Sequence, residues 1–170
     1  MSLDLAALVR DVPDFPRPGI LFRDITPMLA SPAALDACLA QLAQPFERPD
    51  AVVGIESRGF LFGVGLALRW AVPFVPARKL GKLPGATVQE RYALEYGEDH
   101  LEMQAGALQP GARALVVDDL LATGGTAAAT VRLVERLGAR IHGVAFVIEL
   151  VELGGRAQLG GRNVHALLKL

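Results

Sequence analysis

Residues 115–126 read Leu-Val-Val-Asp-Asp-Leu-Leu-Ala-Thr-Gly-Gly-Thr, and this stretch decides the fold. Its apolar beginning predicts a buried strand over 113–117, which ends at two adjacent acids. A short loop with two glycines leads directly into residues 126–137, whose apolar spacing predicts a helix that Gly138 ends. A strand, a glycine-containing turn and a helix together form half of a β–α–β unit.

The rest of the chain continues this alternation of strands and helices. Short apolar runs predict strands, and amphipathic or N-capped segments predict helices. The expected strands are residues 51–55, 74–77, 100–104, 113–117, 141–149 and 164–168, and the expected helices are residues 3–9, 32–44, 60–70 and 126–137. Three prolines from Pro13 to Pro18 predict an extended or turned segment. The pattern indicates an α/β fold with a mainly parallel twisted sheet flanked by helices, in which ligands bind at the C-terminal ends of the strands.

The loop between the decisive strand and its helix has the composition of a phosphate-binding site. Gly124 and Gly125 let backbone N–H groups approach an anion, and the N-terminus of the helix adds partial positive charge. The hydroxyls of Thr123 and Thr126 are further donors. The segment has neither the lysine of a GxxxxGK[ST] P-loop nor a GxGxxG dinucleotide fingerprint. It therefore predicts a phosphate site of another class.

Asp118 and Asp119 narrow the choice of ligand. Two carboxylates would repel a bare polyphosphate, but they accept hydrogen bonds from vicinal hydroxyls or help to hold a hydrated Mg²⁺. A phosphate about one sugar length from a diol describes a ribose 5-phosphate. The alternative is that the acids only cap a turn in an ordinary loop. The order of strand, acids, glycine loop and helix favours the ligand site.

Composition limits the class of protein further. The chain has 170 residues, of which 52% are hydrophobic and 21% charged, which suits one folded domain and argues against disorder. The formal net charge of −1 offers no basic excess for nucleic acid, and the longest apolar run, Phe60 to Leu68, is too short to span a membrane. The N-terminus lacks the basic region of a secretory signal, and one cysteine, Cys38, allows no intramolecular disulfide. We expect a cytoplasmic protein that binds neither nucleic acid nor membrane.

Several further motifs accompany the decisive stretch in order along nearly the whole chain. They are Asp14-Phe15-Pro16 with Pro18-Gly19, Phe22-Arg23-Asp24-Ile25, Glu56-Ser57-Arg58-Gly59-Phe60, Arg78-Lys79 with Gly81-Lys82-Leu83-Pro84-Gly85, Leu94-Glu95-Tyr96-Gly97 and Glu149-Leu150. Together with residues 115–126, this set resembles the type I phosphoribosyltransferases, and within them the branch that acts on adenine. The resemblance implies one domain over residues 1–170, with a small N-terminal segment at 1–30 (the hood) that binds the base and a long flexible loop at 78–97 (the lid).

The resemblance also implies a function. It implies an enzyme of purine salvage that transfers the 5-phosphoribosyl group of phosphoribosyl pyrophosphate (PRPP) to adenine, giving AMP and pyrophosphate. It implies Mg²⁺ held mainly through PRPP and water, with no protein ligand named, and a homodimer. Two alternatives stay open: a transferase for another purine base on the same fold, and a regulatory protein that binds PRPP without catalysis. The regulator is expected to carry a nucleic-acid-binding module or a basic patch, which the net charge of −1 does not favour.

The same resemblance assigns residues to each part of the substrates. Ribose 5-phosphate is assigned to Asp118, Asp119, Ala122, Thr123, Gly124, Gly125 and Thr126; pyrophosphate to Ser57, Arg58, Arg78, Lys79, Lys82 and Tyr96; adenine to Leu21, Phe22, Arg23, Ala122 and Leu150; and the proton of the base to the catalytic residue, Glu95. It further implies a cis peptide bond, not preceding proline, near Ser57.

The chemistry of these residues supports the assignments. A guanidinium at 58 follows a predicted strand and suits a pair of phosphate oxygens, and three cations at the start of the lid suit a departing pyrophosphate. A closing lid would keep water from a cationic sugar intermediate, and an aromatic ring at 22 can pack on a base. The alternatives are a solvated surface arginine at 58, an exposed charged loop at 78–97, and core packing of Phe22 and Leu150.

Overall fold

The structure, a computed structural model, describes residues 3–93 and 97–170. The chain separates into an N-terminal unit, Met1–Gln41, and a larger unit, Leu42–Leu170. The boundary lies inside a helix. The N-terminal unit therefore extends further along the chain than the hood expected at residues 1–30.

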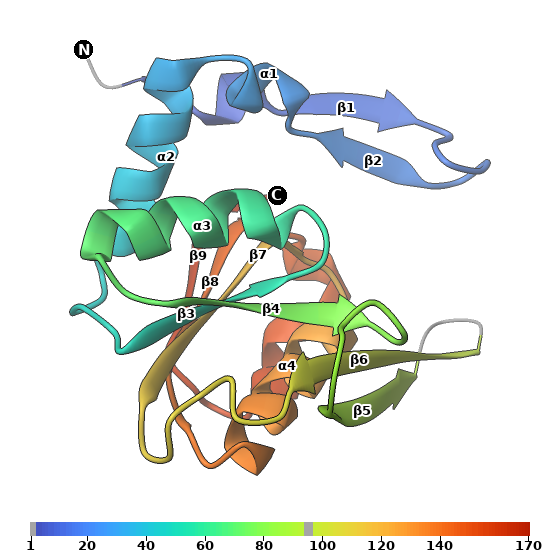
Figure 1. Cartoon of the computed structure of the whole chain (residues 1–170). Coiled ribbons are helices and arrows are strands. Elements are labelled where there is room, and N and C mark those ends of the chain that lie inside the picture. The colour runs from blue at the N-terminus through green and yellow to red at the C-terminus, as the bar shows by residue number, and fades with distance from the viewer. Residues whose placement is uncertain (1–2, 94–96) are drawn as a thin grey trace. The chain divides into compact units, whose positions relative to one another are not determined.

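The N-terminal unit consists of a hairpin followed by two helices (Figure 1, blue). β1 (Arg10–Pro13) pairs antiparallel with β2 (Leu21–Asp24), and the segment between them contains a cis bond before Pro16. α1 (Thr26–Leu29) and α2 (Pro32–Ala43) follow. The extended character predicted for the proline-rich segment and the helix predicted at 32–44 are confirmed.

The helix predicted for residues 3–9 is wrong except for one short turn. Only η1 (Ala6–Leu8) is helical, and it is a 3₁₀ turn. The side chain of Asp4 accepts backbone N–H groups of this turn. The helix ends at Leu8 because β1 begins two residues later, at Arg10, and pairs with β2 in the hairpin. An extended strand leaves no room for further helical turns.

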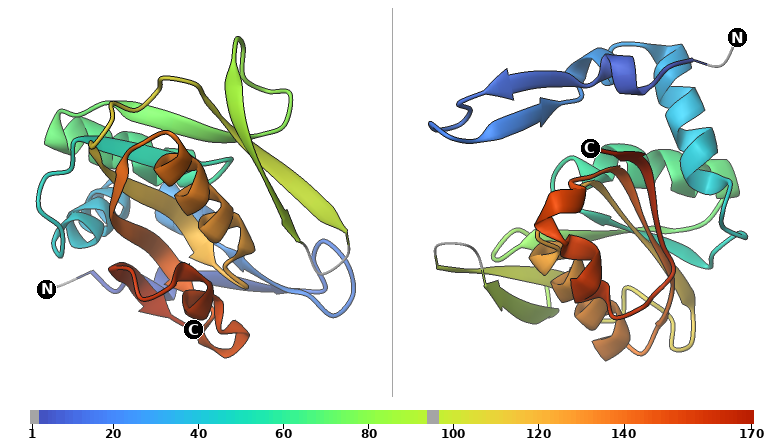
Figure 2. Two further views of the ribbon diagram at one scale, coloured as in Figure 1. Left: turned by 90° about the horizontal axis from the view of Figure 1, so that it is seen from below. Right: turned by 180° about the vertical axis from the view of Figure 1, so that it is seen from behind.

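A seven-stranded sheet forms the centre of the larger unit (Figures 1 and 2). The strands are β3 (Ala51–Ile55), β4 (Phe74–Lys79), β5 (Thr87–Ala93), β6 (Glu98–Gln104), β7 (Arg113–Leu121), β8 (Arg140–Glu149) and β9 (Val164–Lys169). They lie in the order β5-β6-β4-β3-β7-β8-β9. The five strands from β4 to β9 in this order are parallel to their neighbours, whereas β6 runs antiparallel to both β4 and β5. The predicted mainly parallel sheet is confirmed, with an antiparallel pair at one edge.

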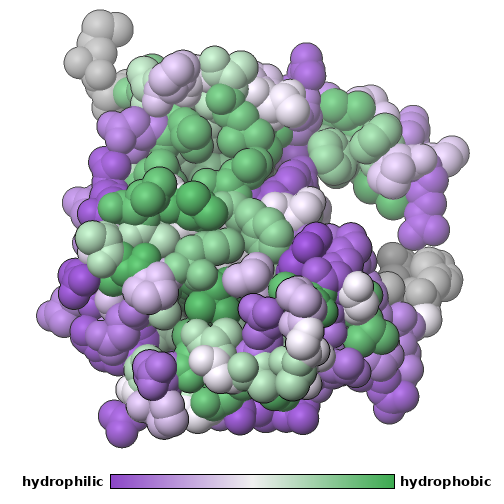
Figure 3. Space-filling view, viewed as in Figure 1, coloured by the Kyte–Doolittle hydropathy of each residue, from purple (hydrophilic) through white to green (hydrophobic). Residues whose placement is uncertain are grey.

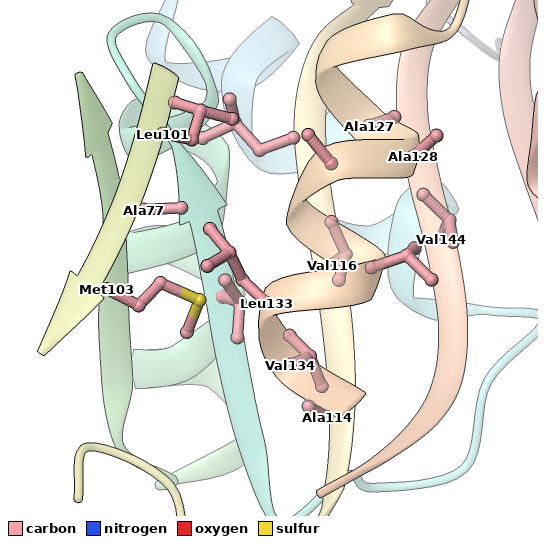
Figure 4. Packing of buried hydrophobic residues seen from close by; sticks show 14 of the residues in the cluster. Ala77, Leu101, Met103, Ala114, Val116, Ala127, Ala128, Leu133, Val134 and Val144 are labelled. Atoms are coloured by element: carbon pink, nitrogen blue, oxygen red, sulfur yellow. The ribbon is translucent and has the colours of Figure 1, made fainter. Parts of the chain in front are cut away.

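Two helices cover the two faces of this sheet. α3 (Gly59–Trp70) connects β3 to β4, and α4 (Gly125–Arg136) connects β7 to β8 (Figure 1). Leu133 and Val134 of α4 belong to the same buried cluster as Val116 of β7 (Figure 4). Two short 3₁₀ segments, η2 (Val151–Leu153) and η3 (Gly155–Leu159), link β8 to β9. This packing fixes the N-terminus of α4 beside the end of β7.

The strands and helices predicted for the larger unit are confirmed to within a few residues, with two extensions. β4 continues through Lys79, and β7 continues through Leu121, which pairs with Glu149 of β8. Both acids of the decisive stretch therefore lie inside the end of β7 instead of in the loop after it. No helix within the described ranges, 3–93 and 97–170, is long and apolar enough to cross a membrane.

The segment 78–97, predicted as a long loop, contains the end of one strand and the whole of another among its described residues, 78–93 and 97. β4 ends within it at Lys79, and β5 pairs with β6 along its whole length (Figure 2). β5 is not predicted because Glu90 interrupts the alternation of apolar and polar residues that indicates a strand. The side chain of Glu90 faces α4, where an apolar residue would be expected. Its carboxylate accepts hydrogen bonds from Arg132 at 2.6 Å and from Arg136 at 3.0 Å. Both arginines lie on the exposed face of α4 and reach Glu90 of β5 from there.

Candidate functional site

The loop between β7 and α4 is built as an anion site. α4 begins at Gly125, and its N-cap, Gly124, adopts a φ of 86° and has no side chain to cap the first helical N–H groups. These N–H groups and the partial positive charge of the helix N-terminus are thus available to a ligand. A cavity of about 70 Å³ opens here, the right scale for one small anion. Its lining includes Ala122, Thr123, Gly124, Gly125 and Thr126.

Asp118 and Asp119 lie beside this loop. Oδ1 of Asp118 accepts the backbone N–H of Asp119 at 2.8 Å. Burial, together with the neighbouring charge of Asp119, raises the pKa of Asp118 well above its usual value. Burial also raises the pKa of Asp119, although the guanidinium of Arg58, 2.8 Å from its Oδ2, acts in the opposite direction. The two carboxylates thus present closely spaced acceptor oxygens, to which a diol or a hydrated cation could donate hydrogen bonds.

The segment after β3 faces these acids from the neighbouring strand. The Glu56–Ser57 bond is cis, as the resemblance implies. Arg58 pairs with Asp119, so its interpretation as a solvated surface arginine is wrong. At the next position a Cβ would lie 2.8 Å from the carbonyl oxygen of Val117 and 2.9 Å from Oδ1 of Asp118. Glycine at 59 therefore lets the start of α3 approach the end of β7 closely.

One cavity of about 300 Å³ collects residues from the ends of three parallel strands and from the antiparallel pair. The residues predicted for the site that line it are Ser57, Arg58, Lys79, Asp118, Asp119 and Thr126. Its wall is completed by Glu56, Tyr92, Leu101 and Leu120. Asp118, Leu120 and Thr126 also line the smaller phosphate-sized cavity, so the two spaces adjoin.

Glu56 gathers the predicted pyrophosphate cations around one carboxylate. Its Oε2 accepts the Nε–H of Arg78 at 3.1 Å and the backbone N–H of Lys79 at 3.0 Å, and its Oε1 accepts Nζ of Lys82 at 2.5 Å. The side chain of Glu56 is only 9% exposed. Burial opposes its ionisation, but these hydrogen bonds outweigh burial and hold the pKa of Glu56 below its usual value. An anion that enters from this side would meet cations that are already assembled.

Lys79 is fixed at the wall of the larger cavity by β6. Its Nζ forms an ion pair with Asp99, and the hydroxyl of Tyr92 donates to the same carboxylate at 3.2 Å. The hydrogen bond to Asp99 raises the pKa of Lys79, and the one from Lys79 lowers the pKa of Asp99. Both groups are therefore charged at neutral pH, and the amine faces the site as a cation.

Glu102 of β6 holds the turn that carries Lys82. Residues 80–86 lie outside the strands. The carboxylate of Glu102, a residue only 2% exposed, accepts the backbone N–H groups of Lys82 at 3.0 Å and of Leu83 at 3.1 Å, and the hydroxyl of Thr87 at 3.1 Å. This buried carboxylate accepts the backbone N–H groups that would otherwise pair with a neighbouring strand. It therefore fixes the position of the backbone at Lys82.

Replacing Glu102 by Gln is expected to lower the free energy of unfolding by about 1–3 kcal/mol, because an amide places a donor against donors that the carboxylate satisfied. Urea unfolding measures this loss. The matched control is Glu98→Gln on the same strand, where the exposed pair with Arg91 predicts a change below about 0.5 kcal/mol. Equal losses in the two variants would contradict the role given to Glu102.

Three of the residues predicted to bind the base lie on β2, in the N-terminal unit. The ring of Phe22 packs edge-to-face on Phe15, with ring centroids 5.1 Å apart. Arg23 forms an ion pair with Asp11 of β1. Leu21 is exposed at the start of the strand. The hairpin thus holds the backbone of residues 21–23 in an extended form.

The other predicted base and proton-transfer residues belong to the larger unit. The backbone N–H of Leu150 donates to the carbonyl oxygen of Leu121 at 2.9 Å, so Leu150 lies next to the start of the phosphate loop at Ala122. Glu95 and Tyr96, predicted for proton transfer and for pyrophosphate, lie outside the described residues.

Sequence reasoning missed three carboxylates that organise the site: Glu56, Asp99 and Glu102. Glu56 had a usable signal, because it is an acid directly after a fully buried strand, at the ligand edge of a parallel sheet. Asp99 and Glu102 had none, because they reach the site only through the antiparallel pairing of β6 with the end of β4. A strand is predicted at residues 100–104, but its antiparallel pairing with Arg78 and Lys79, at the start of the segment predicted as a loop, is not.

The carboxylates of the site are the side chains that could contribute to binding a metal ion. Among residues 3–93 and 97–170 no three His, Cys, Asp or Glu side chains are grouped to hold a metal by themselves. Asp118 and Asp119 offer oxygen atoms, which Mg²⁺ prefers, and Mg²⁺ commonly binds through one or two carboxylates together with substrate phosphates and water. The site therefore fits a magnesium ion that binds together with a phosphate ligand.

The chain is similar to known proteins over most of its length. The family model described as the phosphoribosyl transferase domain matches residues 24–157. An adenine phosphoribosyltransferase from Synechococcus sp. (strain CC9605) is 56% identical over 170 residues, which cover 98% of this chain and 99% of that protein. One from Sorangium cellulosum (strain So ce56) is 59% identical over 160 residues, which cover 93% of this chain and 80% of that protein.

Solved structures agree with the sequence relatives. The adenine phosphoribosyltransferase of Rhodothermus marinus matches with a TM-score of 0.94 at 51% identity, covering 98% of this chain and 96% of that one. The enzyme from Saccharomyces cerevisiae, solved with adenine and an imino-altritol bisphosphate, matches with a TM-score of 0.91 at 43% identity, covering 96% of each chain. The chain therefore belongs to the phosphoribosyltransferase family and, within it, to the adenine phosphoribosyltransferases.

Proposed function

We propose that this protein transfers the 5-phosphoribosyl group of PRPP to adenine, giving AMP and pyrophosphate, as a step of purine salvage. The observation that carries the proposal is the adjacency of two cavities, one at the N-terminus of α4 and one that joins the acid pair to the cations around Glu56. PRPP has a 5′-phosphate, a ribose diol and a pyrophosphate in this order along the molecule, which matches the order of the anion site, the acid pair and the cations. The yeast relative, whose structure contains adenine and a bisphosphate, supports the same substrates.

The phosphoribosyl part of PRPP is assigned to β7 and the loop after it. The N–H groups at residues 123–126 and the hydroxyls of Thr123 and Thr126 bind the 5′-phosphate. Asp118 and Asp119 accept hydrogen bonds from the 2′ and 3′ hydroxyls. Both acids line the larger cavity, where hydrogen bonds from the diol to a carboxylate are stronger than hydrogen bonds between neutral groups.

The pyrophosphate part is assigned to Ser57, Arg58, Arg78, Lys79 and Lys82. Displacement at the anomeric carbon passes through a loosened, oxocarbenium-like state, in which negative charge grows on the departing pyrophosphate. Cations held in place by Glu56 and Asp99 stabilise that charge without having to reorganise. Mg²⁺, held mainly through PRPP and water, supplies further charge neutralisation to the phosphates when it is bound.

The base is assigned to the hood and to the residues flanking the phosphate loop. In the N-terminal unit, Leu21 and Arg23 are assigned main-chain contacts with adenine and Phe22 a contact with its face. In the larger unit, Ala122 and Leu150 are assigned to the base. A main-chain carbonyl that accepts the 6-amino group would reject a 6-oxo purine, which places an acceptor there. Glu95 exchanges the proton of the base and Tyr96 belongs to the same closed site, with the lid residues excluding water.

We also propose a cytoplasmic homodimer. α3 exposes apolar side chains along one face at helical spacing, Leu61, Val64 and Leu68, and Leu68 is 77% exposed. In Figure 3 hydrophobic residues gather over this helix. An exposed apolar face of this kind favours a protein contact, and a second copy of the chain is the partner that the family resemblance implies.

Incubating the purified protein with labelled adenine, PRPP and Mg²⁺ is expected to release AMP and pyrophosphate, and hypoxanthine or guanine to react with a kcat/KM lower by about 10⁴-fold or more. Comparable turnover of a 6-oxopurine would identify a transferase for another base. PRPP binding without pyrophosphate release would identify the regulatory alternative. Neither outcome is compatible with the proposed reaction.

A further inference from the structure

The segment that follows β8 packs its backbone directly against the phosphate loop. This backing segment, residues 150–159, contains η2 and η3 and lies beside α4 (Figure 2). A Cβ on Gly155 would lie 2.1 Å from the carbonyl oxygen of Ala122 and 2.9 Å from the nitrogen of Gly124. Conversely, a Cβ on Gly124 would lie 2.3 Å from the carbonyl oxygen of Gly155. The two stretches of backbone touch, with no space for a side chain on either glycine.

Two anchors hold the backing segment in this position. Arg156 donates to both carboxylate oxygens of Glu149, through Nε at 2.9 Å and Nη2 at 2.5 Å, and through Nη1 to the carbonyl oxygen of Val164 at 2.7 Å. The hydrogen bonds from Arg156 lower the pKa of Glu149, so the pair is ionised at neutral pH. At its other end, Leu159 is fully buried in the core. Gly155 directly precedes Arg156 and contacts the phosphate loop through its backbone, and Gln158, between the two anchors, also lies close to Gly124.

We propose that Gly155 is a positioning residue for PRPP, and that the Glu149–Arg156 pair holds it against the loop. Backbone N–H groups bind an anion only while their directions converge, and a loop of two glycines has little stiffness of its own. Contact with Gly155 supplies that stiffness to Ala122 and Gly124. The inference rests on the proposed function, because it assumes that the loop binds the 5′-phosphate.

The test replaces each of two adjacent glycines by alanine. In Gly155→Ala the new methyl group collides with Ala122, and the KM for PRPP and the Kd for AMP are expected to rise at least tenfold, with the KM for adenine within threefold of the original. Gly154→Ala is the matched control. Gly154 has a φ of 64° and nothing within 4 Å of its Cβ position, so alanine there strains the backbone but leaves the loop alone. The control is expected to lose stability and to keep its KM for PRPP.

A second pair of variants decides the matter if Gly155→Ala does not fold. Arg156→Gln removes the anchor without adding a methyl group, and a rise of at least threefold in the KM for PRPP is expected. Arg113→Gln is its control, because Arg113 also joins a carboxylate, that of Asp50, and a carbonyl oxygen, that of Arg48, but lies at the start of β7, at the opposite end of the strand from the phosphate loop. An unchanged KM in both Gly155→Ala and Arg156→Gln, or equal rises in variants and controls, overturns the proposal.

The same measurements separate this proposal from the proposed function. If the unmodified protein turns over PRPP and binds AMP by calorimetry while the Gly155 and Arg156 variants do so equally well, only the positioning role is wrong. If the unmodified protein neither turns over PRPP nor binds AMP, the assignment of the phosphate loop is wrong, and the role proposed for Gly155 is wrong as well.

Discussion

Replacing Asp118 and Asp119 together by Asn is expected to lower kcat/KM for PRPP by about 10²–10⁴-fold, because each carboxylate contributes a charge-assisted hydrogen bond of about 1.5–3 kcal/mol to the ribose diol. Asparagine keeps the shape and the acceptor oxygen that receives the backbone N–H of residue 119. The loss therefore reports the two charges, including the ion pair of Asp119 with Arg58, and not a rearranged strand. Calorimetric titration with PRPP and steady-state kinetics measure it.

The Asp118→Asn change alone is expected to make the ligand-free protein more stable at neutral pH. Burial and Asp119 raise the pKa of Asp118 in the folded state above its value of 3.8 in an unperturbed chain. Ionisation therefore costs the folded state more than the unfolded state, and stability is lost as the pH rises through this interval. Asn removes that cost, and each kcal/mol recovered corresponds to about 2–4 °C in Tm.

Calorimetry at two pH values checks the sign of this effect. The gain in Tm of Asp118→Asn over the unmodified protein is expected to be small near pH 4 and larger near pH 8. Glu47→Gln, at a side chain that is 89% exposed, is the control and is expected to change Tm little at either pH. A variant that is less stable near pH 8, or that binds PRPP undiminished, would contradict the role given to the acid pair.

The central part of the fold could be predicted because its sequence signals are local. β3 and residues 114–117 of β7 are wholly apolar or glycine, as strands buried on both faces must be, and the glycine loop fixes where α4 begins. β5 could not be predicted, because Glu90 is compensated by two arginines of α4 that lie far along the chain. An ion pair between distant segments leaves no periodic trace in either of them.

The same distinction applies to the site. The phosphate loop and its acids are contiguous in the sequence, so the phosphate and diol sites could be predicted from residues 115–126. The arrangement of the cations around Glu56 could not be predicted from the sequence. It depends on the parallel register of β3 and β4 and on a turn that Glu102 holds. The cis bond before Ser57 was available only through the family resemblance, because the residues themselves do not indicate it.

Lys82→Ala is expected to lower kcat by about 10²–10³-fold, the typical loss for one group that stabilises charge only as it develops. Lys82 is the cation of this cluster that reaches the site from a turn, held there by Glu102 and paired with Glu56. Its removal leaves the phosphate loop and the acids intact, so the Kd for AMP is expected to stay within threefold. Single-turnover kinetics and calorimetry separate the two quantities.

Lys169→Ala is the matched control, because Lys169 ends β9, which β7 and β8 separate in the sheet from β3 and the Glu56 that follows it. Glu56→Gln provides the stricter test. If Glu56 serves Lys82 by holding it in place, the double variant loses less than the sum of the two single losses, because the second change removes a support that no longer has anything to hold. Full additivity would mean that Glu56 acts independently of Lys82. In that case the 2.5 Å contact between them would be a feature of the ligand-free protein only, and the pyrophosphate would be organised by Arg58, Arg78 and Lys79.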